Sequence, residues 1–151
     1  QYVKQEPHVY SIEDTSSLTI YNVQMMGTLV ELSNLRVVSG YNTYSSDAFS
    51  IECEDAFGNI INIRVDAKSA IKQDKIGELI EIAPGTDKTA KKCYYEDGPL
   101  NPRGLHNINC WQFFKGKTFE KLYGIVTIYD GEYNEPIVQI MLTRTEDIVL
   151  A

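Results

Sequence analysis

Two neighbouring segments with alternating polarity constrain the fold of this chain more than any other feature. Apolar side chains occupy every second position of residues 49–54, and they do so again in residues 61–65. A period of two is the pattern of a β-strand that buries one of its faces. The segment between them, residues 55–59, ends in a Phe-Gly-Asn run that favours a turn. We therefore expect a β-hairpin here.

Further strands are predicted on both sides of this hairpin. Residues 18–32 are rich in β-forming side chains, and Gly27 within them suggests a bulge or a bend, so we expect a long, bent first strand. Residues 122–129 and 137–142 predict a last hairpin, with its turn at residues 130–136.

A short helix is predicted between the two hairpins. Asp66 is a good N-cap, residues 67–76 read as the helix, and residues 78–83 as a short strand. The order of bent strand, hairpin, short helix, strand and last hairpin is that of a five-stranded Greek-key barrel of the OB type. The predicted fold class is therefore an all-β, OB-fold-like β-barrel with one short helix.

The length of the chain and its polar segments predict a single domain. At 151 residues, it has the usual size of one domain. Residues 1–17 are predicted as a polar N-terminal arm, and residues 18–151 as one OB-fold-like domain. Residues 39–47 have the composition of a polar loop. Residues 85–118 show no sustained period and are predicted as a loop-rich insertion before the last hairpin.

The charge of the chain is unevenly distributed. The formal net charge is −7, which argues against a general nucleic-acid binder, because phosphates are repelled by an acidic surface. Residues 88–121 are the exception, with seven Lys and Arg against three acidic residues, a local net charge of +4. Aromatic side chains interleave with these cations, and single-stranded nucleic acid needs both kinds of group.

This basic segment supplies the first candidate binding site. Its rings could stack on bases or on the faces of sugars. Alternatively, the aromatic residues anchor a long loop on the barrel and the lysines keep that loop soluble. The candidate ligand-binding residues of the segment are Tyr94, Tyr95, Trp111, Lys115 and Lys117.

A second candidate site follows from the predicted barrel. OB domains bind ligands through their second and third strands and through the loops that join strands one to two and four to five. In this chain those loops carry tyrosine and asparagine, which suit a contact surface. Alternatively, they are surface turns with incidental tyrosines. The residues of this site are Tyr41, Asn42, Tyr44, Arg64, Tyr133 and Asn134.

Three cysteines leave two alternatives open. Cys53 lies in a strand pattern and reads as a buried thiol, whereas Cys93 and Cys110 flank part of the insertion. A Cys93–Cys110 disulfide would stabilise the fold by roughly 3 kcal/mol through the loop that it closes. The alternative is three reduced thiols.

The motifs of common enzyme classes fail in this sequence. Gly116-Lys-Thr118 resembles the end of a phosphate-binding loop, but Trp111 stands where that motif needs a glycine. His8 and His106 have no partners at the spacing of a zinc site. We therefore expect no enzymatic activity, no metal and no cofactor.

Several segments resemble a known family at the level of pattern. They are residues 23–30, residues 48–53 with 58–63, and residues 122–126 with 137–140. In these the chain resembles the small OB-fold domains of exported Bacteroidetes-type proteins, lipoproteins described as binding nucleic acid. The resemblance covers most of the chain apart from the arm and the insertion. It implies an OB fold and carries over no catalytic residue.

The expected function is that of a binding module outside the cytoplasm, in the periplasm or at the cell surface, with a lipid anchor attached through a removed leader. The expected ligand is single-stranded nucleic acid or a glycan. The alternative is a protein–protein assembly module of the bacterial cell envelope, in which an exposed edge strand takes up a strand of an envelope protein. The sequence contains no apolar run long enough for a transmembrane helix.

Overall fold

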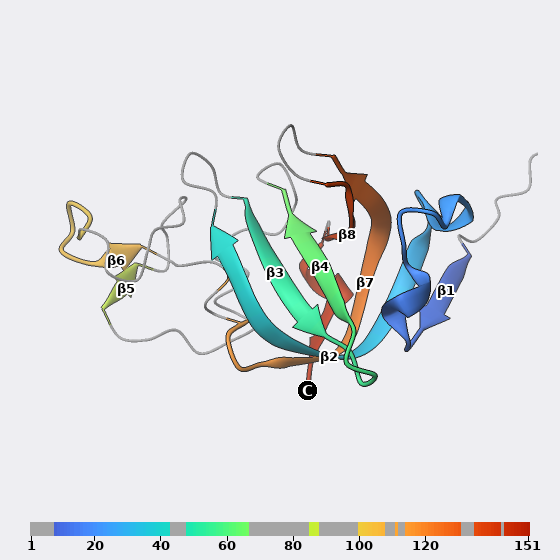
Figure 1. Cartoon of the computed structure of the whole chain (residues 1–151). Coiled ribbons are helices and arrows are strands. Elements are labelled where there is room, and N and C mark those ends of the chain that lie inside the picture. Colours follow the sequence, from blue (N-terminus) through green and yellow to red (C-terminus); the bar gives the residue numbers. More distant parts are fainter. Residues whose placement is uncertain are drawn as a thin grey trace, which may run out of the picture.

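The computed structural model describes residues 8–42, 48–66, 85–87, 100–107, 111, 114–130, 135–142 and 144–151. Regular structure in these residues consists of β-strands and of 3-10 helices three residues long (Figure 1). The prediction of an all-β barrel is confirmed. The helix expected at residues 67–76 and the strand expected at residues 78–83 lie outside the described residues. No helix in the described part of the chain is long and apolar enough to cross a membrane.

Five strands form a closed barrel. They are β2 (Leu29–Asn42), β3 (Phe49–Glu54), β4 (Ile60–Val65), β7 (Thr118–Tyr129) and β8 (Ile137–Leu142). The order β2-β3-β4-β8-β7 closes because β7 also pairs with β2. The barrel is mixed, since β4 and β8 are parallel and the other four pairs are antiparallel.

The long strand β2 makes the closure possible. Its first part, Leu29–Arg36, pairs with β7, and its second part, Arg36–Asn42, pairs with β3. A register shift between Val37 and Ser39 marks an irregularity where the strand passes from one partner to the other. Such a bulge bends a strand and increases its twist, which a closed barrel needs.

The position of this strand corrects the sequence prediction. The long strand was expected at residues 18–32, but it begins at Leu29 and continues to Asn42, through part of the segment expected as a loop. Residues 18–28 form turns and the 3-10 helix η2 (Val23–Met25). Leu18 is buried and Ile20, Met25 and Met26 pack against the core, whereas Tyr21 and Val23 are exposed, so the β-forming residues here do not build a strand.

The segment expected as an N-terminal arm contributes a strand. β1 (Val9–Ile12) pairs in parallel with Leu29–Leu32 of β2, outside the closed barrel (Figure 1). The 3-10 helix η1 (Thr15–Ser17) follows, and Thr15 is buried.

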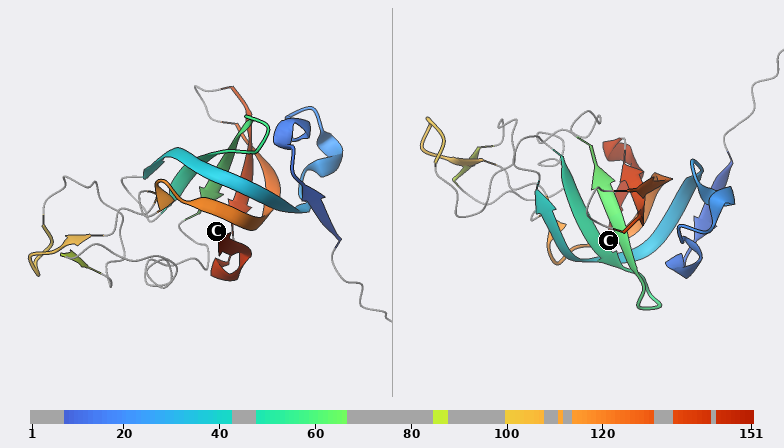
Figure 2. Two further views of the ribbon diagram at one scale, coloured as in Figure 1. Left: turned by 90° about the horizontal axis from the view of Figure 1, so that it is seen from below. Right: turned by 45° about the horizontal axis from the view of Figure 1, so that its top comes forward.

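Shorter elements complete the described chain. β9 (Ile148–Leu150) follows the 3-10 helix η4 (Thr145–Asp147) and pairs antiparallel with β7. β5 (Thr86–Asp87) and β6 (His106–Asn107) form a small parallel pair. Figure 2 shows this pair apart from the barrel, on the side opposite to β1.

One apolar core fills the barrel. The alternating residues of β3 and β4 enter it as predicted, because Phe49, Ile51 and Ile63 are buried. Residues from the end of the insertion join them, since Phe114 stacks on Phe49 with ring centroids 6.4 Å apart. The largest fully buried side chains are those of Phe49, Phe114, Phe119, Leu32, Leu35, Ile51, Ile63, Leu122, Ile140 and Leu142.

Candidate functional site

The outer face of β2, β3 and β4 carries a row of three side chains in register. Tyr41 lies opposite Ser50, and Ser50 lies opposite Arg64. Because Phe49 and Ile51 point into the core, the strand alternation turns Ser50 outward. Directly opposite residues on one face lie about 5 Å apart, so the three side chains are neighbours.

A hydrogen bond fixes the arginine of this row. Arg64 Nη1 donates to Ser50 Oγ over 2.9 Å. Ser50 is only 1% exposed, and Arg64 is half-buried. A half-buried guanidinium held by a neighbouring strand presents a cation in a defined position rather than on a mobile side chain.

Tyr41 is the exposed member of the row. The residue is 54% exposed and lies next to the end of β2. An accessible aromatic ring beside a positioned cation is a suitable surface for a flat or ring-shaped ligand. The row can therefore bind by stacking and by polar contacts.

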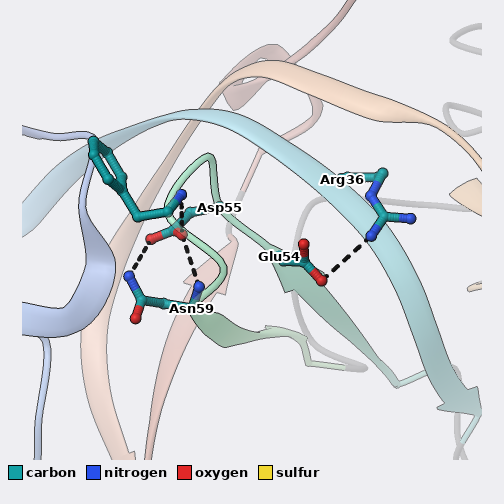
Figure 3. Close-up of polar contacts among 5 residues, drawn as sticks. Arg36, Glu54, Asp55 and Asn59 are labelled. Carbon is teal, nitrogen blue, oxygen red and sulfur yellow. Dashed lines mark hydrogen bonds and ion pairs between the residues drawn. The ribbon is translucent and has the colours of Figure 1, made fainter.

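A second and a third row continue the face with polar and charged side chains. In the second, Ser39 Oγ donates to Glu52 Oε2 over 2.7 Å, and Glu52 lies opposite Asn62. In the third, Arg36 forms an ion pair with Glu54 at 3.3 Å (Figure 3).

These rows balance the charge of the face. The second part of β2, Arg36–Asn42, together with β3 and β4, carries two arginines, Arg36 and Arg64, and two glutamates, Glu52 and Glu54. These three rows therefore carry no excess of either sign.

Beside this face, Asp55 organises the turn between β3 and β4. Its carboxylate accepts hydrogen bonds from the backbone N–H groups of Phe57 and Asn59 and from the Asn59 amide (Figure 3). It also accepts from the N–H and the hydroxyl of Thr15, each at 2.8 Å. Burial alone would raise the pKa of Asp55, but hydrogen bonds from Thr15 and Asn59 outweigh it and hold that pKa well below its usual range. Asp55 thus stays ionised and ties η1 to the barrel.

The structure places some of the predicted site residues and not others. Tyr41 and Arg64 lie in one row, and Asn42 ends β2 opposite Phe49. Lys115 and Lys117 are exposed just before β7, where Lys117 O accepts from Val37 N. The remaining predicted residues lie outside the described part of the chain: Tyr44, Tyr94, Tyr95, Tyr133, Asn134 and the proposed disulfide Cys93–Cys110.

The position of Trp111 differs from that of an exposed stacking platform. Its ring is half-buried and packs against the core. A Cβ added to Gly40 would lie 2.8 Å from this ring and 2.5 Å from the Ser50 carbonyl oxygen, so glycine allows the ring to approach β2 closely. The ring of Trp111 thus packs on the barrel.

Cys53 lies in the core as predicted. Burial, reinforced by the charge of Glu52, raises the pKa of its thiol to about 12. The thiol is therefore protonated at neutral pH and is poorly suited to act as a nucleophile.

Sequence reasoning missed the polar partners of the face. Ser50, Ser39, Glu52 and Asn62 were not among the candidate residues. The signal that could have found them is the polar half of the alternation in the hairpin, since every polar position there shares the outer face with Arg64.

Comparison of the chain with family models, with curated proteins and with solved structures gives no match in any of the three. The resemblance to the Bacteroidetes-type OB-fold domains therefore stays a prediction.

Proposed function

We propose that this protein is a non-enzymatic binding module with a barrel of the OB type. The outer face of β2, β3 and β4 is its binding surface. The observation that carries the proposal is the row in which exposed Tyr41 lies beside Ser50 and the hydrogen-bonded Arg64.

The strand order supports the assignment to the OB type. A long, bent β2 pairs with both β3 and β7, and the parallel β4–β8 pair closes a five-stranded barrel. OB barrels bind oligonucleotides and oligosaccharides on the face of their second and third strands, which correspond to β3 and β4 in this chain.

The charge of the face favours an oligosaccharide. A neutral, polyhydroxylated ligand needs no excess charge on the face, whereas a polyphosphate gains little from rows in which two glutamates balance the two arginines. Tyr41 would stack on a sugar ring, and the Arg64, Glu52 and Asn62 side chains would fix its orientation.

Single-stranded nucleic acid is the second candidate. Lys115 and Lys117 are exposed close to the register shift of β2, at one border of the face. They would supply the phosphate contacts that the face itself lacks, and Tyr41 would stack on a base for about 1–3 kcal/mol.

Binding measurements on the full chain separate these candidates. The protein is screened on an oligosaccharide array and titrated with a labelled oligo-dT strand at low and high salt. Tyr41→Ala is compared with Tyr21→Ala, since Tyr21 is 86% exposed but lies in the turns before η2 and not on this face.

We expect oligosaccharide binding that is insensitive to salt, is lost in Tyr41→Ala and is retained in Tyr21→Ala. Salt-sensitive binding of oligo-dT that is lost in Lys115→Ala/Lys117→Ala would replace the glycan by nucleic acid. Binding of neither probe, or equal binding by both tyrosine variants, would overturn the proposed face.

A further inference from the structure

A different surface, the free edge of β1, lies on the far side of β2. β1 is the terminal strand of the large sheet and pairs only with β2 in the part of the chain that the structure describes. Figures 1 and 2 show β1 at one side of the molecule, outside the barrel. Its second edge therefore presents backbone N–H and C=O groups to the surroundings.

Apart from its shortness, four residues, this edge lacks the usual protection of an edge strand. Natural edge strands carry lysine, proline or a bulge, which prevent pairing with other chains. Val9–Ile12 contains none of these residues, and its pairing with β2 runs without a register shift. Val9 and Tyr10 are 38% and 42% exposed.

The strand is nevertheless held in place. Ser11 Oγ donates to Glu31 on β2, and behind β1 the Asp55 carboxylate holds Thr15 while Leu18 is buried in the core. A strand that is already fixed loses little conformational freedom when another strand pairs with it.

The two faces of β1 differ in chemistry. Tyr10 and Ile12 lie opposite Val30 and Leu32, whose side chains enter the core, so this face of β1 continues the apolar side of the sheet. Ser11 lies opposite Glu31 on the other face, which Val9 shares by the alternation, and Glu13 follows directly after β1.

The surroundings of the edge are acidic on balance. Residues 8–35 contain Glu13, Asp14 and Glu31 and no lysine or arginine. Lys121 of β7 pairs with Glu31 at 3.5 Å, so the charges that would attract a partner are those of Glu13 and Asp14, in a chain with a net charge of −7. A strand that docks here gains from cationic side chains on the Ser11 face and from apolar side chains on the Tyr10 face. A second copy of this chain carries the same acids and the same net charge, so it fits less well.

From these observations we propose that β1 is a docking edge for an extended, basic segment of a partner protein. The segment adds a strand to β1, and its lysine or arginine side chains alternate with apolar ones. This goes beyond the proposed ligand-binding face, and neither depends on the other.

The test uses the full chain labelled with ¹⁵N and a synthetic peptide of alternating valine and lysine, about eight residues long, within the usual length of a strand. A peptide with glutamate in place of lysine is the control. We expect the lysine peptide to shift and protect the amides of Val9–Ile12, with an affinity that falls as salt rises, and the glutamate peptide to cause no change.

Two charge-reversal variants locate the site. Glu13→Lys should weaken binding of the lysine peptide by about fivefold, the effect of an exposed charge pair. Glu135→Lys makes the same change in net charge at an exposed position before β8, and it should leave the affinity unchanged. Equal effects of the two variants would show a general charge effect and overturn the proposal.

Proline substitutions test the backbone pairing itself. Successive N–H groups of a strand point to opposite edges, so one of Tyr10→Pro and Ser11→Pro removes a donor from the free edge. The variant that removes a donor from the free edge should keep the wild-type melting temperature and should no longer bind the lysine peptide. Three results would each overturn the proposal of a basic partner segment. They are amide shifts away from β1, equal binding of the two peptides, and a concentration-dependent dimer that protects Val9–Ile12 without peptide.

Discussion

The two parts of β2 carry outer side chains with opposite roles. In the first part, Glu31 accepts from Tyr123 OH at 2.7 Å and from Ser11 at 3.4 Å, and Lys121 lies 3.5 Å away. In the second part, Tyr41 is more than half exposed. The first part pairs with strands on both edges, β1 and β7, and its polar row is satisfied internally. The second pairs with β3, and its row leaves the ring of Tyr41 exposed.

The largest effect is expected where the second part of β2 meets Trp111. Gly40→Val adds a side chain whose Cβ lies 2.5 Å from the Ser50 carbonyl oxygen, so the β2–β3 pair itself must shift. We expect a loss of about 3 kcal/mol in the free energy of unfolding, measured by urea denaturation.

Ser39→Ala, on the same strand, is the control and should cost less than about 1 kcal/mol. If Gly40→Val were as mild as this control, the close approach of Gly40 to the Ser50 carbonyl oxygen and to the Trp111 ring would be wrong.

A smaller effect is expected in the first part of β2. Glu31→Ala removes the acceptor of the Tyr123 hydroxyl and the counter-charge of Lys121. We expect a loss of about 1–2 kcal/mol, the cost of leaving such donors without their partner. Ser50→Ala, on β3 in the row of Tyr41, is the corresponding deletion for the second part; it removes the acceptor of one Arg64 bond and should cost about 1 kcal/mol. The comparison fails if Ser50→Ala proves the more damaging of the two.

The polar row of Glu31 should also make stability depend on pH at both extremes. The hydrogen bond from Tyr123, with the charge of Lys121, lowers the pKa of Glu31 from its ordinary 4.5. The same hydrogen bond raises the pKa of Tyr123 from 10.0. Below pH 4.5, Glu31 takes up a proton more readily in the unfolded chain than in the folded one. Above pH 10, Tyr123 releases its proton more readily in the unfolded chain. The stabilisation is therefore present between these values and is lost outside them.

Tyr123→Phe tests this dependence. Urea denaturation gives the free energy of unfolding at each pH. In Tyr123→Phe this free energy should fall less above pH 10 than in the wild type. It should also fall less in acid, because Glu31 loses its main hydrogen-bond donor. Tyr21→Phe changes an exposed tyrosine and should leave both limbs unaltered. An alkaline limb that Tyr123→Phe does not change would mean that other groups control it.

The sequence predicted those parts of the fold whose signal is local. The bounds of β3 and β4 follow from side chains that alternate within six residues, and the structure places the strands at Phe49–Glu54 and Ile60–Val65. β2 was misplaced because Leu18–Met26 has β-forming residues that pack as turns, while Ser39–Asn42 has the composition of a loop and yet pairs with β3.

The residues of the candidate site were brought together only in part by sequence reasoning, for a related reason. Tyr41 and Arg64 were candidates because of their places in a predicted barrel. Their common neighbour Ser50 depends on the register between three strands, and register is set by turns and pairings that no single segment contains. The same holds for β1, whose pairing with β2 joins residues twenty positions apart.

The smallest effect on stability is expected at Tyr41, the exposed residue in the second part of β2. Tyr41 lies on the outer face with half of its surface in solvent, so Tyr41→Ala should change the free energy of unfolding by less than about 0.5 kcal/mol. The same variant should lose ligand binding, since the ring is the exposed member of its row. A residue that matters for binding and not for folding is what separates a binding row from a structural one. Urea denaturation and ligand titration of the same preparation give the change in stability and the change in affinity. A loss of stability similar to that of Glu31→Ala would mean that the row of Tyr41 is structural, like that of Glu31.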